Sequence, residues 1–97
     1  MKWIRSTLRW SGPRVRKSVL AAYIVGSEAR GTARPNSDLD IAVVITPVRG
    51  KTPLQFSDYY HQRQAHLPEW NGRNVDFQFF YPDDMELVTY SKIPIES

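Results

Sequence analysis

Two aspartates two positions apart are the first residues of this chain whose spacing suggests chemistry. Asp38 and Asp40 stand at the start of a β-branched apolar run, residues 39–45, which predicts a strand. Both carboxylates then project from one face, and two like charges side by side are unfavourable unless a cation binds between them. Mg²⁺ suits such a pair, because it uses few protein carboxylates and fills its shell with water and phosphate oxygens. The alternative is a solvated Ser-Asp turn that opens the strand.

A Gly-Ser pair follows the first apolar run and suggests a phosphate-binding turn. Gly26-Ser27 ends residues 18–25, which read as a strand covered on both faces, and a short helix is expected next. The first N–H groups of a helix have no partner within it, so together with the Ser27 hydroxyl they can hold phosphate oxygens, and glycine lets the ligand approach closely. An ordinary helix cap is the alternative, because Gly-Ser turns are common.

Asp76 is a third carboxylate in an unexpected place. It stands second in a strand predicted over residues 75–81, in which nearly every other residue is apolar or aromatic. Buried acids are rare unless they are paired or bind a metal. If this strand lies beside that of Asp40, we expect three carboxylates to converge within a few ångströms, where they could hold metal ions and accept a proton from an attacking hydroxyl. An exposed position at the end of an edge strand is the alternative.

The elements that must position these residues alternate along the chain. Strands are expected over 18–25, 39–45 and 75–81, and helices over 1–11, 52–67 and 83–90. This alternation predicts an α/β or α+β fold, a small mixed sheet with helices packed on one face. The covered face should hold alternate residues of two strands, namely Leu39, Ile41, Val43, Val75, Phe77 and Phe79.

The central helix has a clear start and several residues that need an interpretation. Thr52 and Gln55 are spaced as a capping box, with Pro53 at the first helical position. Tyr59 and Tyr60 are expected in the core rather than as a platform for a base. His61 and His66 are five apart, the wrong spacing for two ligands on one face, and are expected to be surface or packing residues.

Composition limits the class of protein. The 97 residues are 41% hydrophobic and 12% aromatic, which is enough for one packed core, and no run approaches the roughly 18 apolar residues that span a membrane. Cysteine is absent, which excludes disulfides and thiolate metal sites, so we expect a cytoplasmic location. The net charge of +3 is uneven, because residues 1–17 carry six basic side chains and no acidic one. This segment is either a surface that meets phosphate or an acidic partner, or a solvated helix face.

Taken together, these motifs resemble a known family. Gly26-Ser27-Glu28-Ala29-Arg30-Gly31, then Ser37-Asp38-Leu39-Asp40, and then Asp76 in a hydrophobic strand are similar to the minimal nucleotidyltransferases of the DNA polymerase β superfamily. The resemblance covers roughly residues 15–90. It implies a polymerase β-like fold, with residues 18–97 as the nucleotidyltransferase domain. Residues 1–17, a basic N-terminal helical segment by their composition, are not part of the family's motif.

The resemblance also implies an activity and a site. It implies transfer of a nucleoside monophosphate from an NTP, with ATP favoured, to a hydroxyl of a protein or a small molecule. The implied catalytic residues and Mg²⁺ ligands are Asp38, Asp40 and Asp76, with two ions expected and Mn²⁺ as a substitute. The implied nucleotide-binding residues are Gly26, Ser27, Arg30 and Ser37.

Two other functions remain open at this point. Many minimal members are the antitoxin of a pair with a HEPN-domain toxin, and some adenylylate that toxin, so a HEPN-type protein is an expected partner. A second hypothesis is an antitoxin that neutralises its partner by direct contact with little or no catalysis. A nucleic-acid-binding module is the weakest hypothesis, because no such motif is visible and residues 18–97 are net acidic.

Overall fold

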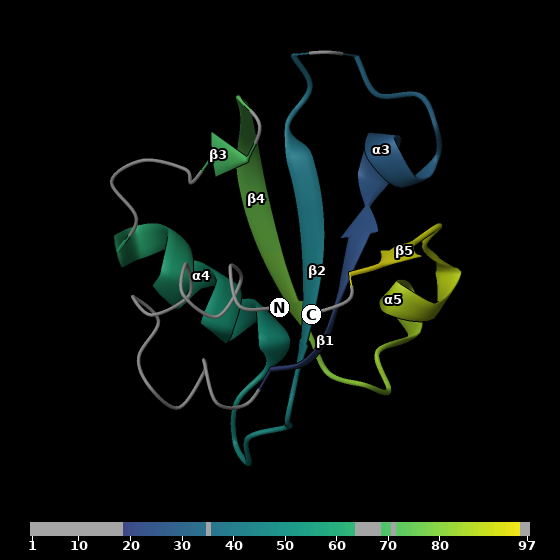
Figure 1. Ribbon diagram of the computed structural model, residues 1–97. Helices are drawn as coiled ribbons and strands as arrows, with labels where there is room; N and C mark the ends of the chain where they lie inside the picture. The colour runs from purple at the N-terminus through teal and green to yellow at the C-terminus, as the bar shows by residue number, and fades with distance from the viewer. Residues whose placement is uncertain (1–18, 35, 64–68, 71, 96–97) are drawn as a thin grey trace.

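The computed structural model describes residues 19–34, 36–63, 69–70 and 72–95 (Figure 1). In chain order the elements are β1 (Val19–Val25), α3 (Gly26–Ala29), β2 (Leu39–Ile45), α4 (Pro53–Arg63), β3 (Glu69–Trp70), β4 (Arg73–Phe80), α5 (Met85–Thr89) and β5 (Ile93–Pro94). The helix expected over 1–11 and the basic segment 1–17 lie outside the described residues. None of the helices in the described ranges is long and apolar enough to cross a membrane.

The strands form a mixed sheet, as the sequence predicts, and their order is β3-β4-β2-β1-β5. β2 pairs antiparallel with β1 and parallel with β4, so α4 is the crossover between the two parallel strands. Figure 1 shows β4, β2 and β1 side by side, with α4 next to β4 and α3 at the end of β1. The two-residue strands β3 and β5 were not expected, since each is too short to show a periodic pattern.

The two faces of the sheet separate by residue parity. One face holds the larger core, which the six predicted residues form with α4 through Tyr60 and the partly buried Phe56. The opposite face has a smaller cluster, in which Phe80 packs with Leu87 of α5 and Tyr90. The mixed α+β fold is confirmed, and the short α5 adds a second contact layer to the one-sided arrangement that the sequence predicts.

Helix α4 begins as predicted and closes one edge of the sheet. The Gln55 side chain accepts a hydrogen bond of 2.9 Å from the Thr52 N–H, as a capping box requires. The Phe79 N–H of β4 donates to the Ser57 hydroxyl at 3.2 Å, so the helix satisfies a backbone donor at the strand edge. Tyr60 is fully buried, whereas Tyr59 is 43% exposed, so the expectation that both tyrosines enter the core is wrong for Tyr59. Successive helical residues point about 100° apart, and only one of them can face the sheet.

Candidate active site

Asp40 and Asp76 are brought together by the parallel pairing of β2 and β4. Their Cα positions are direct partners in the register, so the two side chains stand next to each other on the same face. Burial raises the pKa of Asp40, and the negative charges of Asp76 and then Asp38 raise it further, against the opposing effect of Arg30 and Arg73. The predicted proximity of these two acids is therefore confirmed.

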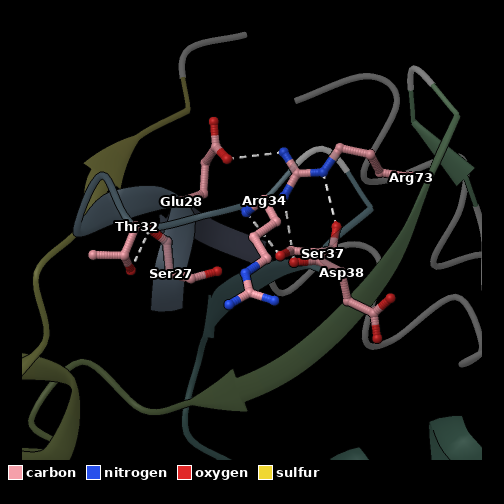
Figure 2. Close-up of polar contacts among 7 residues, drawn as sticks. All are labelled: Ser27, Glu28, Thr32, Arg34, Ser37, Asp38 and Arg73. Atoms are coloured by element: carbon pink, nitrogen blue, oxygen red, sulfur yellow. Dashed lines mark hydrogen bonds and ion pairs between the residues drawn. The ribbon is translucent and has the colours of Figure 1, made fainter.

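Asp38 occupies a different position from the other two acids. It precedes β2, is exposed, and its backbone carbonyl accepts a hydrogen bond from Arg73, while Figure 2 shows its carboxylate directed away from that guanidinium. Among the described residues, no three His, Asp or Glu side chains gather as a metal-binding group. The expected convergence of all three carboxylates is not seen there, because Asp38 is held by a loop and not by the pleat of the sheet.

The donor set that is present fits a hard divalent cation. Two carboxylates on adjacent strands offer oxygen ligands, and a cation between them would relieve the repulsion that raises the pKa of Asp40. Water and substrate phosphate oxygens would supply the remaining ligands, as is usual for Mg²⁺. Asp40 and Asp76 are thus the residues best placed to hold such an ion.

Gly26 of the Gly-Ser turn lies directly against Asp40 of this acid pair. Gly26 has a φ of 69°, and a Cβ added there would overlap the Oδ2 atom of Asp40, so glycine is needed for both conformation and space. Gly26 opens α3, whose N-cap residue, Val25, makes no side-chain capping hydrogen bond. The first N–H groups of α3 therefore lie near the carboxylate of Asp40 and receive no hydrogen bond acceptor from the N-cap side chain.

A cavity of about 370 Å³ opens next to the turn and to Asp40. It is lined by Val25, Gly26, Arg30, Asp40, Gln78, Thr89, Tyr90 and Ser91. This volume lies within the usual range for sites that bind small molecules, roughly 300–1,000 Å³. Arg30 brings a positive charge to the wall of the cavity, and Gln78, Thr89 and Ser91 bring polar groups that can bind either donors or acceptors.

Ser27 and Ser37, both predicted to bind nucleotide, do not line this cavity. The Ser37 hydroxyl accepts a hydrogen bond of 2.9 Å from the Arg34 N–H, and the Ser27 carbonyl accepts one of 2.9 Å from the Thr32 N–H (Figure 2). These bonds shape the loop between α3 and β2. They use the Ser37 oxygen as an acceptor, whereas its proton stays available to a ligand.

Two residues near the acids were not identified from the sequence as part of the site. His61 is exposed, as expected for a surface residue, but its Nε2 atom also lies 2.9 Å from Oδ1 of Asp76, a contact that the sequence did not predict. Arg73 contacts Glu28 of α3 and the backbone of residues 37 and 38. The contacts of both residues join positions 15 or more apart in the sequence, so local sequence patterns could not predict them.

Asp40 beside a glycine turn, with Asp76 on the adjacent strand, is an arrangement suited to a divalent ion and phosphate groups. Residues 1–95 match the family model described as "Nucleotidyltransferase domain", and the chain belongs to that family. Its structure is similar to the crystal structure of a Sulfolobus solfataricus protein provisionally assigned as a nucleotidyltransferase, with a TM-score of 0.63 and 19% identity. The match covers 96% of this chain and 76% of that one, and it supports the fold. No curated protein matches the sequence significantly.

Proposed function

We propose that this nucleotidyltransferase moves a nucleoside monophosphate from an NTP, with ATP favoured, to a hydroxyl group. The observation that carries the proposal is the placement of Asp40, which lies against Gly26, lines a ligand-sized cavity and has Asp76 as its register partner on the adjacent strand. A phosphate chain bound at Gly26 and Ser27 would lie beside the carboxylate of Asp40, whose register partner is Asp76. Arg30 in the cavity wall would balance part of its charge.

In the proposed reaction, the acceptor oxygen forms a bond to the α-phosphorus while the bond to the bridging oxygen breaks and pyrophosphate leaves. Asp76 would take the proton of the attacking hydroxyl. His61 donates a hydrogen bond to Oδ1 of Asp76 and so orients the carboxylate, which leaves Oδ2 for the incoming group. Most of the rate would come from positioning and from neutralising charge on the phosphates.

A divalent ion belongs to this proposal, with Mg²⁺ favoured, Mn²⁺ as a substitute and two ions expected. Asp40 and Asp76 would hold it, and Asp38 would join them if its loop turned inward. When bound, the ion would neutralise phosphate charge and polarise the phosphorus centre. The proposed nucleotide-binding set is Gly26, Ser27, Arg30 and Ser37.

The acceptor is proposed to be a protein hydroxyl, with a HEPN-type protein as the partner and the cytoplasm as the location. This part rests on the motif resemblance. A role as a binding-only antitoxin had its sequence support in the basic segment 1–17, which lies outside the described residues, and no contact among the described residues favours it over transfer.

The test is transfer of label from α-labelled ATP in the presence of Mg²⁺, with a co-purified partner and with small hydroxyl compounds as acceptors. Pyrophosphate should appear in equal amount to the transferred label, and Asp40→Asn should abolish both. Asp58→Asn on the exposed side of α4 is the matched control and should leave transfer unchanged. Binding of Mg²⁺ and ATP by the wild type that is unaffected by Asp40→Asn would refute the assigned site.

A further inference from the structure

Arg73, at the start of β4, joins three segments that the proposed site depends on. Its Nη1 donates to Oε2 of Glu28 at 2.9 Å, its Nε to the Ser37 carbonyl at 2.9 Å, and its Nη2 to the Asp38 carbonyl at 3.4 Å. Figure 2 shows the guanidinium between α3 on one side and the loop before β2 on the other. All three guanidinium nitrogens are therefore used, each by a different acceptor.

The partners of Arg73 belong to the two halves of the proposed site. Glu28 is the third residue of α3, the helix that Gly26 and Ser27 begin. The carbonyls of residues 37 and 38 come just before the strand that carries Asp40. From β4, Arg73 thus links the proposed phosphate turn to residues 37 and 38, which precede β2. Arg73 is 36 positions from Ser37 and 45 from Glu28 in the sequence.

The chemistry of the side chain suits this link better than a direct contact with substrate. A guanidinium is planar and presents its donors in fixed directions, so it sets angles as well as distances among its acceptors. The Arg73 side chain is only 19% exposed, and it does not line the cavity, whereas Arg30 does. Three of its five N–H donors are already directed at the protein.

We propose that Arg73 is a positioning residue that fixes the α3 turn relative to Asp38 and the start of β2, the strand of Asp40, so that phosphate and ion are bound in one geometry. The proposal rests on the proposed function for its catalytic consequence, but the structural link itself is independent of it. A displacement of about 1 Å between such groups lowers a reaction rate by about a hundredfold.

The experiment compares Arg73→Gln, Arg73→Lys and Glu28→Ala, with Arg49→Gln as the matched control, since Arg49 is an exposed arginine in the loop after β2. We expect Arg73→Gln to lower transfer about a hundredfold, mainly in kcat, and Glu28→Ala about tenfold, because it removes one of the three bonds. Arg73→Lys should restore part of the rate. The melting temperature should fall by about 5 °C, as for the loss of a partly buried ion pair.

The double variant Arg73→Gln/Glu28→Ala separates positioning from direct binding. If Arg73 acts through Glu28, the double variant is no slower than Arg73→Gln alone, because the same link is broken once. If Arg73 binds phosphate itself, Glu28→Ala frees it and tightens ATP binding, and that result would overturn the proposal.

Hydrogen exchange supplies a readout without any nucleotide. Amides of residues 27–31 and 37–40 should exchange at least about tenfold faster in Arg73→Gln than in the wild type, with no change in Arg49→Gln. Unchanged exchange in Arg73→Gln would overturn the link even if the wild type transfers label. A wild type that neither binds Mg²⁺ with ATP nor transfers label would refute the proposed function alone, and exchange would still decide on Arg73. If Arg73→Gln does not fold, Glu28→Ala gives the same comparison.

Discussion

Replacing Asp40 by asparagine should make the protein more stable while it removes activity. Asp40 and Asp76 are register partners on adjacent strands, so their charges are held close together. At the roughly 5 Å between strands, two unit charges repel by about 0.8 kcal/mol in water and about 3 kcal/mol at an effective dielectric constant of about 20. Arg30 and Arg73 offset part of this repulsion. We therefore expect a net gain of about 1 kcal/mol at neutral pH, or about 4–8 °C in melting temperature.

The gain should depend on pH in a direction that the pKa of Asp40 fixes. Burial, with the charges of Asp76 and Asp38, raises that pKa above its ordinary value of 3.8. A raised folded-state pKa means that the stability contributed by the protonated carboxyl is fully present below pH 3.8 and is lost as pH rises through the folded-state value. Asparagine is neutral at every pH, so the advantage of the variant should be near zero at acidic pH and largest at neutral pH.

Urea unfolding of the wild type and of Asp40→Asn at about pH 4 and about pH 7.5 measures this difference. Asp58→Asn, which removes an exposed acid elsewhere, should change neither value by more than about 0.5 kcal/mol. A variant that is less stable than the wild type at neutral pH, or a gain that is equal at both values, would show that Asp40 makes favourable contacts that outweigh the repulsion. The electrostatic reasoning would then be refuted.

Three further predictions follow from single contacts. Gly26→Ala should lower the free energy of unfolding by about 2 kcal/mol or more, against about 1 kcal/mol for Gly31→Ala. Both glycines have positive φ, but only a Cβ at Gly26 overlaps Asp40. Equal losses of unfolding free energy in the two variants, measured by urea unfolding, would contradict this. Tyr60→Phe should raise stability by about 1 kcal/mol, since the Tyr60 hydroxyl is buried without a hydrogen-bond partner. It should also remove the loss of stability expected between about pH 10 and pH 12, because burial raises the pKa of Tyr60 to about 12. Calorimetry across this pH range tests both effects. Asp76→Asn should retain ATP binding and lower transfer at least about a hundredfold, and label transfer at the wild-type rate would exclude Asp76 as the proton acceptor.

Much of the sheet was predictable because its strands carry local patterns. The run 39–45 is β-branched and apolar, and it matches β2 residue for residue. In β4 the alternation of aromatic and polar residues predicted which side chains face α4, and Phe77 and Phe79 lie in that core. The start of α4 followed from the side-chain chemistry of Thr52 and Gln55.

The site was predictable only where its residues form local sequence motifs or interrupt a local pattern. The Gly26-Ser27 turn and the Asp38–Asp40 pair are local motifs, and Asp76 was conspicuous because it interrupts a hydrophobic strand. Asp38 has the strand parity of Asp40 but lies before the first paired residue, so parity alone misplaced its carboxylate. Which strands pair is a non-local property, and the sequence allowed Asp76 to lie at an edge or beside Asp40.

The parallel pairing of β2 with β4 explains why these residues form a group. Two parallel strands need a crossover, and here the crossover is α4. The same helix that covers the core therefore carries His61 to Asp76, and the same strand that places Asp76 beside Asp40 begins with Arg73, three residues earlier. A sheet in which β4 paired elsewhere would separate the acid pair, the histidine and the arginine at once. The proposed acid pair and its supporting residues thus depend on one topological choice, and variants that weaken the β2–β4 contact should lose the whole arrangement together.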